Sequence, residues 1–246
     1  MTATVTSPMT APTAASMTGR YGSLVEQWRA ACPAEWQAYT RHAFVQGLGD
    51  GTLPRAAFLQ YLVQDYVFLV HFCRAWSLAI VKAETLEETR ACTGILDALV
   101  NHEMALHVQT CAAEGIGEAT LYGAIEEIET LAYTRYVMDT GLQGDFLDLM
   151  AALAPCCFGH GEIGLWLAQE AGDTPYRAWI DTYADPDYQQ AMAQVGAMID
   201  GAARRRLGEA PMASARWPQL QHRFTTATRL EAGFWDMGLR GGSCRA

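Results

Sequence analysis

The chain has 246 residues, of which half are hydrophobic and 18% are charged, and its formal net charge at pH 7 is −10. This length is enough to bury a sizeable core, and the composition is that of a globular protein. The negative charge argues against a nucleic-acid interface, because phosphate binding calls for clustered Lys and Arg. We interpret the basic cluster Arg204, Arg205 and Arg206 as a solvated helix end, where cations are favoured.

The beginning of the chain has the composition of a disordered leader. Residues 1–18 are rich in Thr, Ala, Ser and Pro, and no basic residue precedes an apolar stretch, so we expect no signal peptide. No apolar run reaches the ~18 to 20 residues of a membrane span, and we expect no membrane contact. The expected parts are a leader over 1–20, one helical domain over 21–240 and a flexible tail over 241–246.

Apolar side chains recur with the helical period of 3.6 residues through most of the chain, and the long alternations typical of strands do not occur. Gly and Pro mark the breaks between helical segments, and no long linker or internal repeat appears. We therefore predict an all-α, single-domain bundle of about seven or eight helices. Their expected ranges are 22–46, 54–82, 85–114, 119–140, 144–171, 174–183, 186–207 and 215–239.

Asp65 stands in the middle of an apolar helical stripe that runs from Phe58 to Ile80 and includes Phe68. A buried, ionised carboxylate without partners costs several kcal/mol, by the usual order of magnitude. We therefore expect Asp65 to be paired, satisfied by hydrogen bonds or used to bind a ligand.

Two further reactive side chains lie on apolar stripes. Glu231 shares one with Phe234, and Cys156 shares another with His160. Because Cys156 follows Pro155, we expect a break in the 144–171 segment, where free N–H groups at a new helix start would favour a thiolate. His160, one turn later, could accept the proton of the thiol or stabilise its charge. The inert reading of Cys156, as a small buried hydrophobe, stays open.

The seven cysteines are odd in number, mostly embedded in apolar helical sequence, and without the C-x-x-C pairs of zinc or redox sites. They favour reduced thiols and a cytoplasmic location. Aromatic residues are more frequent than packing alone requires, and many carry a hydroxyl that needs a partner when buried. Core packing explains most of them, and a flat heteroaromatic ligand would explain the rest.

Other chemistries find little support in the sequence. The Glu-x-x-His spacing of di-iron bundles does not precede any of the six histidines, and we predict no metal site. In the string NHEMALH, His102 and His107 are five residues apart and cannot share an ion as an i, i+4 pair does. Glu103 and His107 share a face, and we interpret them as a helix-surface or structural pair. No G-x-S-x-G, GxGxxG or Walker loop occurs.

With these residues identified, the chain resembles the TenA family, the thiaminase II or aminopyrimidine aminohydrolases, which have a haem-oxygenase-like helical fold. The resemblance runs from about Gly22 to Leu239. Five motifs in the same order carry it. They are HAFVQGLGDGTLPRAAFLQYLVQDYVFL (42–69), AYTRY (132–136), APCCFGHGEIG (154–164), YRAWIDTYADPDY (176–188) and RLEAGFWDM (229–237).

The resemblance implies a role for each matching position. It places the catalytic cysteine on Cys156, not Cys157, the pyrimidine-binding aspartate on Asp65 and the acid/base glutamate on Glu231. Substrate-binding positions fall on Phe68, Tyr133, His160, Tyr183 and Phe234. Phe68 and His160 stand where the family often has Tyr, so a hydroxyl is lost near the ring and the hydrogen bonds around the thiol change. The family also implies a homotetramer, with a small pyrimidine as partner and no cofactor.

The function implied is hydrolysis of thiamine-derived aminopyrimidines, with 4-amino-5-aminomethyl-2-methylpyrimidine or thiamine giving the 5-hydroxymethyl pyrimidine, in thiamine salvage. Cys156 would add to the ring, Asp65 would hold the ring and Glu231 would act as acid and base. Two alternatives stay open. One is a haem-oxygenase-like oxidase or oxygenase, and the other is a non-catalytic pyrimidine-binding regulator.

Overall fold

The described part of the chain, residues 19–243 of a computed structural model, consists of twelve α-helices without a β-strand. The predicted all-α fold is confirmed. The expected leader therefore lies mostly outside the described residues, as do the last three residues of the expected tail. The helices in chain order are α1 Ser23–Ala30, α2 Pro33–Thr40, α3 Ala43–Asp50, α4 Arg55–Lys82, α5 Leu86–Ala98, α6 Met104–Ala113, α7 Glu118–Tyr122, α8 Ile128–Gln143, α9 Phe146–Glu170, α10 Arg177–Ala184, α11 Pro186–Leu207 and α12 Trp217–Ser243.

Helices are more numerous than expected because three predicted segments are divided. The first gives α1, α2 and α3, the 85–114 segment gives α5 and α6, and the 119–140 segment gives α7 and α8. Pro33 opens α2, at a position where its missing N–H is harmless. His42 opens α3 by accepting a hydrogen bond from the Phe44 amide through Nδ1. The C-terminal helix α12 is longer than expected and continues to Ser243.

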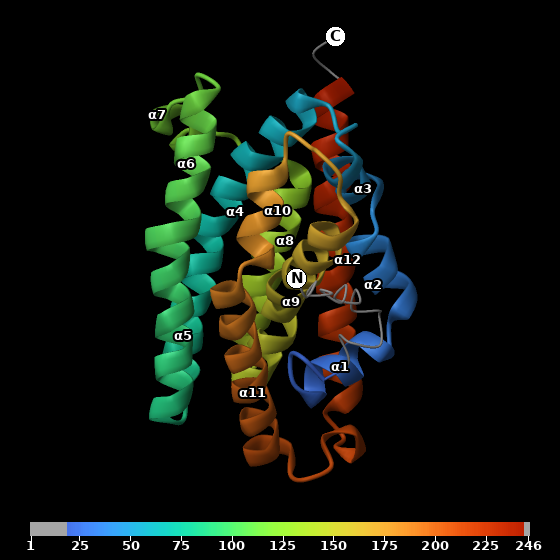
Figure 1. The fold of residues 1–246 in the computed structure, drawn as a ribbon. Helices are drawn as coiled ribbons and strands as arrows, with labels where there is room; N and C mark the ends of the chain where they lie inside the picture. The colour runs from blue at the N-terminus through green and yellow to red at the C-terminus, as the bar shows by residue number, and fades with distance from the viewer. Residues whose placement is uncertain (1–18, 244–246) are drawn as a thin grey trace, which may run out of the picture.

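Helix α9 is the centre of the bundle, in contact with α2, α4, α8, α10, α11 and α12 (Figure 1). A capping box formed by Asp145 and Asp148 starts it, and most of its side chains are buried. The break expected at Pro155 does not occur, because α9 runs through this residue without interruption. Cys156 therefore lies in the middle of a continuous helix and not at a helix start.

Glycines on α9 allow two neighbouring helices to come close to it. A Cβ atom on Gly159 would lie 2.0 Å from the Tyr39 ring, and a Cβ atom on Gly164 would lie 2.5 Å from the backbone of Tyr183. Both distances are far below contact distance, so only glycine fits. These approaches bring Tyr39 of α2 and Tyr183 of α10 beside His160.

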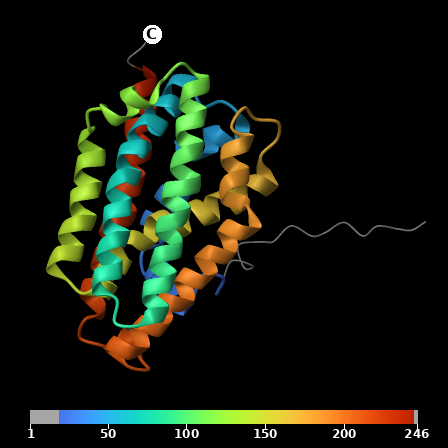
Figure 2. The ribbon, with the colours of Figure 1, turned by 90° about the vertical axis from the view of Figure 1, so that its left-hand side faces the viewer.

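Helices α5 and α6 form the outer wall of the bundle and are joined by one π-helical turn, Leu99–Glu103 (Figure 2). Wide turns of this kind occur frequently at functional sites.

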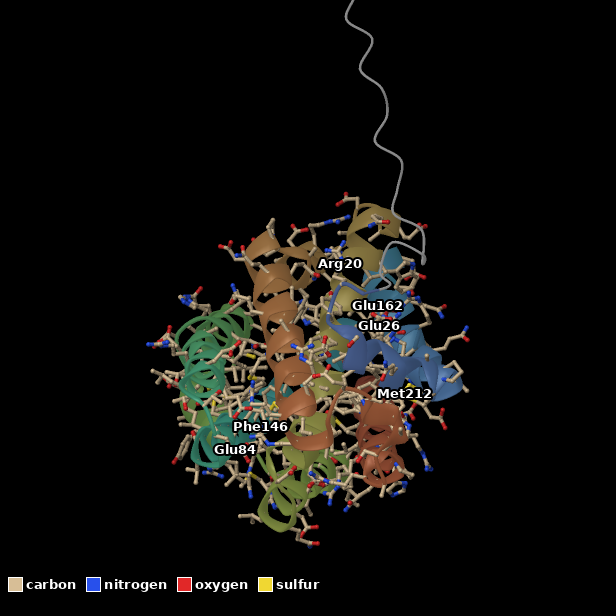
Figure 3. The ribbon with its side chains drawn as sticks, turned by 90° about the horizontal axis from the view of Figure 1, so that it is seen from below. Arg20, Glu26, Glu84, Phe146, Glu162 and Met212 are labelled. Carbon is tan, nitrogen blue, oxygen red and sulfur yellow. The ribbon has the colours of Figure 1, made fainter. Side chains whose placement is uncertain are left out.

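At the lower end of the wall, Arg206 of α11 pairs with Glu84 at 3.3 Å and with the fully buried Glu88 at 2.6 Å. It also lies over the Phe146 ring, in the region where Glu84 and Phe146 are labelled in Figure 3. We expected the basic cluster to form a solvated helix end. This prediction is wrong for Arg206, although Arg204 is exposed.

Helix α4 is the one helix of residues 19–243 that is long and apolar enough to cross a membrane, judged by length and composition alone. In its most apolar stretch, however, 56% of the residues are buried inside the bundle. This is typical of a core helix. Asp65, with 6% of its surface exposed, lies on its buried face.

Candidate active site

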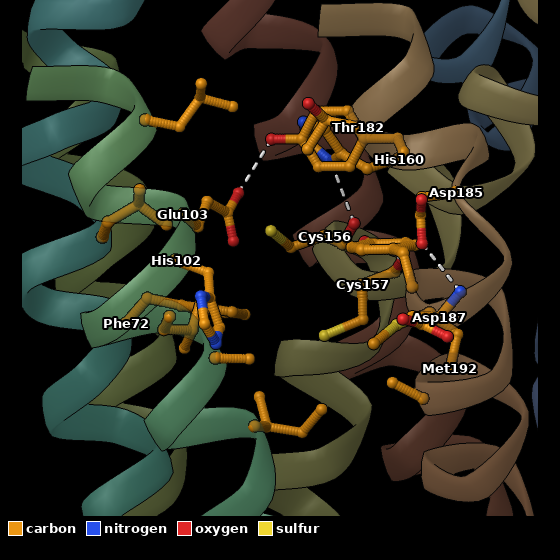
Figure 4. Close-up of a pocket in the computed structure, with 18 of the residues that line it drawn as sticks. Phe72, His102, Glu103, Cys156, Cys157, His160, Thr182, Asp185, Asp187 and Met192 are labelled. Carbon is orange, nitrogen blue, oxygen red and sulfur yellow. Dashed lines mark hydrogen bonds between the residues drawn. The ribbon is translucent and has the colours of Figure 1, made fainter. Parts of the chain in front are cut away.

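A cavity of about 530 Å³ opens between the α5–α6 wall, α9, α10 and α11. Four of the predicted site residues line it, namely Asp65, Cys156, His160 and Tyr183. Glu103, from the wall, points across the cavity toward Cys156, while Asp185, Asp187 and Met192 border the opposite side (Figure 4). We call this space the outer cavity.

A second, much smaller space of about 10 Å³ adjoins it, and we call this the inner cavity. It shares Asp65, Cys156 and His160 with the outer cavity. The other four predicted residues line only the inner one: Phe68, Tyr133, Glu231 and Phe234. All eight predicted residues therefore line one or both of two spaces that share Asp65, Cys156 and His160. The aromatic rings expected to stack on a ligand lie around the inner cavity, where Phe68 and Phe234 are in edge contact with centroids 5.7 Å apart.

Cys156 is enclosed by protein but partly accessible from the cavities. Burial, followed by the charges of Glu231, Cys157, Glu103 and Asp65, raises the pKa of its thiol well above the usual value. The prediction that a helix start would make Cys156 a thiolate is therefore wrong for the site without substrate. The thiol is neutral there and needs a base before it can act as a nucleophile.

The position of Glu231 allows it to act as this base. Its Oε1 accepts a hydrogen bond of 2.8 Å from the Tyr133 hydroxyl, and Cys156 and Tyr39 lie near enough to lower the pKa of the carboxyl group. Burial raises the pKa of Glu231 to about 8 against these contacts, which lower it. A carboxyl group with a pKa in this range can both donate and accept a proton near neutral pH.

Asp65 is held by two donors on the same oxygen. Oδ2 lies 2.6 Å from His107 Nε2 and accepts a 3.1 Å hydrogen bond from the Tyr61 hydroxyl. The other ring nitrogen of His107 lies 2.9 Å from the carbonyl oxygen of Glu103, which can only accept. Burial opposes a charge on His107, but the hydrogen bond and charge of Asp65 raise its pKa to about 9. At neutral pH the two side chains form a buried ion pair.

His160 is fixed by two contacts of one ring nitrogen. Nδ1 lies 2.9 Å from the carbonyl oxygen of Cys156 and 2.9 Å from the Tyr39 hydroxyl. Because a carbonyl only accepts, Nδ1 carries the hydrogen. Burial lowers the pKa of His160, so the ring is neutral and Nε2 keeps a lone pair.

Sequence reasoning missed three residues of the site, Tyr39, Glu103 and His107. Glu103 and His107 face inward, and the helix-surface interpretation of this pair is wrong. The Glu103 carboxylate accepts a 2.8 Å hydrogen bond from the Tyr183 hydroxyl. The i, i+4 spacing of the pair was visible, but nothing in the sequence indicated that both side chains would meet Asp65 and Tyr183.

The residues best placed to hold a metal ion in the described range are Cys156, His160 and Glu231, whose ligand atoms lie within 4.8 Å of one another. The sequence analysis found no such set, because the groups come from two distant helices. A thiol, an imidazole and a carboxylate would suit zinc. Binding would require the loss of the protons that burial keeps on Cys156 and Glu231.

The chain is similar to a known family and to relatives from bacteria. The TENA/THI-4/PQQC family matches residues 29–241. An uncharacterised protein from Haemophilus influenzae is 36% identical over 88% of this chain and 99% of its own length. An aminopyrimidine aminohydrolase from Halalkalibacterium halodurans is 34% identical over 82% of this chain and 89% of its own.

Solved structures give the same picture of the fold. A protein from Silicibacter sp., described as a TenA family transcription regulator, superposes with a TM-score of 0.89 at 54% identity. The match covers 91% of this chain and 99% of that one. A TenA homologue from Pyrococcus horikoshii superposes with a TM-score of 0.79 at 24% identity, over 89% of this chain and 99% of its own.

Proposed function

The chain belongs to the TENA/THI-4/PQQC family, and we propose that it hydrolyses 4-amino-5-aminomethyl-2-methylpyrimidine, and thiamine as a second substrate, to the 5-hydroxymethyl pyrimidine in thiamine salvage. The observation that carries the proposal is the convergence of Asp65, Cys156 and Glu231 on the inner cavity. Relatives named aminopyrimidine aminohydrolase support it.

Asp65 would bind the pyrimidine. A carboxylate can accept hydrogen bonds from the exocyclic amine and from a protonated ring nitrogen, in a two-point, charge-assisted contact. The bonds from His107 and Tyr61 occupy Oδ2, which leaves Oδ1 as the better acceptor for the ligand. The ring would lie where the two cavities meet, and we expect Phe68, Tyr133 and Phe234 to move apart and pack on it.

Cys156 would open the reaction by adding to C6 of the ring. As the S–C6 bond forms, the thiol proton passes to Glu231 and the ring electron pair moves toward the nitrogen that faces Asp65. Addition breaks the aromaticity that otherwise resists loss of the group on the 5-methylene carbon. The contact between Cys156 and Glu231 supplies the short path for this proton.

The second half of the reaction uses the same proton. The ring electron pair returns through C5 and expels the group on the methylene carbon. A neutral amine takes the proton from Glu231 as it leaves, whereas an ammonium or a thiazolium leaves as the neutral base and Glu231 gives its proton to solvent. Water then adds to the methylene carbon and gives a proton to Glu231, and the thiol leaves C6 with that proton as the ring becomes aromatic again. The inner cavity of about 10 Å³ next to Glu231 is close to the ~10–15 Å³ that one water needs.

A non-catalytic pyrimidine-binding regulator is the second candidate, because the 54% identical solved protein carries the description of a transcription regulator. The net charge of −10 gives such a role no support through direct DNA contact. The oxidase alternative would use the Cys156, His160 and Glu231 set to hold a metal.

The proposed function is tested by comparing turnover of the aminomethyl pyrimidine and of thiamine by the purified protein. We expect the hydroxymethyl pyrimidine from both, with ammonia released from the first. Tight pyrimidine binding without turnover of either compound would favour the regulator.

We also propose a homotetramer in the cytoplasm, which size-exclusion chromatography with light scattering and cell fractionation would test. The six cysteines of the described range are all unpaired, as a reducing compartment would require.

A further inference from the structure

The wall of the outer cavity is acidic. Asp65, Glu103, Asp185 and Asp187 line it, and its lining residues include no Lys or Arg. Asp185 has a structural task, since it accepts a 2.8 Å hydrogen bond from the Asp187 amide at the start of α11. Asp65 and Glu103, in contrast, lie deep in the site on neighbouring walls.

His107 bonds directly to the side chain of only one of these two deep carboxylates. His107 is bonded through Nε2 to Asp65 and through Nδ1 to the backbone oxygen of Glu103, so both of its donors are used. The Glu103 side chain has the Tyr183 hydroxyl on Oε1, and its second oxygen has no donor among residues 19–243. The Glu103 carboxylate thus has no cation bonded to it among residues 19–243, and the charge of His107 only partly offsets the burial that raises the pKa of Glu103.

We propose that Glu103 is a specificity-determining residue that selects pyrimidines whose leaving group is positively charged, such as an ammonium or a thiazolium. This inference rests on the proposed function. Glu103 projects into the outer cavity opposite Cys156 (Figure 4). We place the substituent of the bound ring on this side of Cys156. A cation there would supply the missing partner of the carboxylate, and an enclosed pair of this kind is far stronger than an exposed one.

The same charges would exclude phosphate esters. A phosphate in the outer cavity would meet carboxylates and no Lys or Arg. Phosphorylated pyrimidines would therefore need a phosphatase reaction before they could serve as substrates.

The test uses Glu103→Gln, which removes the charge but keeps the size of the side chain and an acceptor for Tyr183. In a Cys156→Ala background, which cannot form the adduct, calorimetry at pH 7 would compare the aminomethyl pyrimidine, a cation, with the neutral hydroxymethyl pyrimidine and its phosphate ester. With Glu103 present we expect the phosphate to bind at least about tenfold more weakly than the neutral compound. Glu103→Gln should weaken binding of the cation by about tenfold or more and change binding of the neutral compound by less than about twofold.

Equal losses for the cation and the neutral compound, or no loss for the cation, would overturn the proposal. Glu114→Gln is the matched control, because it removes one carboxylate charge just beyond the end of α6, outside the cavity, and should leave both affinities unchanged. Thermal unfolding of each variant would identify a folding defect, and Glu103→Ala would then repeat the comparison. Since binding is read without turnover, charge selection can fail while the aminohydrolase activity stands, and the reverse is equally visible.

Discussion

The Tyr39 hydroxyl lies 2.9 Å from His160 Nδ1 and is near enough to Glu231 to lower the pKa of its carboxyl group. His160 stands where related sequences often have Tyr, so this chain has an imidazole in place of one hydroxyl and brings a second hydroxyl from α2. Because Nδ1 donates to the carbonyl of Cys156, the Tyr39 oxygen accepts and its hydrogen is free for Glu231. Tyr39 thereby connects the acid/base group to the histidine.

Tyr39→Phe should impair catalysis more than binding. Loss of the hydroxyl removes a contact that lowers the pKa of Glu231, so that pKa should rise. We expect the ascending limb of kcat/KM against pH to move to higher pH and kcat at neutral pH to fall by about tenfold or more. Tyr136→Phe is the control, because its hydroxyl bonds to the Arg223 carbonyl away from the cavities. An unchanged pH profile in Tyr39→Phe would contradict this role.

Cys156→Ala should abolish turnover and leave pyrimidine binding largely intact, since it removes the nucleophile and leaves Asp65 in place. The adjacent Cys157→Ala provides the matched comparison, because it removes a buried thiol from the same turn of α9. We expect that variant to keep kcat within a few-fold of the wild type. Single-turnover assays and equilibrium binding would measure both effects, and activity retained in Cys156→Ala would refute the assignment of the nucleophile.

The pH dependence of the reaction should report Glu231. Its pKa of about 8 means that the fraction able to take the Cys156 proton grows as the pH rises toward 8. We therefore expect kcat/KM to increase with pH and to level off above that value. Glu231→Gln should lose this limb together with at least about a hundredfold in kcat. The same profile in the wild type and in Glu231→Gln would assign the titration to another group.

The pair of Asp65 and His107 should make stability depend on pH. His107 has a pKa of about 9 in the folded chain, against an ordinary value of 6.5. A raised pKa stabilises the fold fully below pH 6.5, and this contribution is lost as the pH rises through 9.

Thermal unfolding between pH 6 and 10 would measure this loss. At pH 7, His107→Asn leaves Asp65 without its cation and should cost about 3–5 kcal/mol, and the dependence on pH should flatten. The exposed His222→Asn is the control and should unfold like the wild type. If the His107 variant had the same stability and the same pH dependence as that control, Asp65 and His107 would not form an ion pair in solution.

Chelation should not affect the enzyme. The raised pKa values of Cys156 and Glu231 oppose the deprotonated ligands that a metal requires at the one candidate set in residues 19–243. We expect turnover to survive dialysis against EDTA, and elemental analysis of protein purified without chelator to find less than stoichiometric zinc or iron. Stoichiometric metal, with activity lost on its removal, would favour the oxidase alternative.

Periodicity was sufficient to predict an all-helical fold and to identify Asp65, Cys156 and Glu231 as polar groups on core faces. It could not indicate Tyr39, because the contact with His160 depends on how closely α2 approaches α9 at Gly159. Glu103 was missed because a π-helical turn, invisible in the residue pattern, orients the wall that carries it. Contacts between distant helices are decided by packing, which local patterns do not encode.

Two predictions from the sequence, the helix break at Pro155 and the solvated basic cluster, are wrong for the same physical reason. Pro155 suggested a helix break, but the packing that surrounds α9 keeps the helix continuous through it. The basic cluster at the end of α11 suggested solvent, but Arg206 is drawn to the buried Glu88. Burial raises the pKa of that glutamate, but the bonds from Arg206 and Arg205 outweigh burial and lower the pKa to about 2. In both places tertiary contacts overrode a local preference.

The wide turn at Leu99–Glu103 sets the rotational phase between α5 and α6. Each residue of an α-helix turns the chain by about 100°, so adding or deleting one residue there would swing the whole of α5 relative to α6. Ile95 would then leave the cavity wall while His107 kept its place beside Asp65. Divergence in length at this point could reshape the entrance for new leaving groups without disturbing the atoms that perform the reaction.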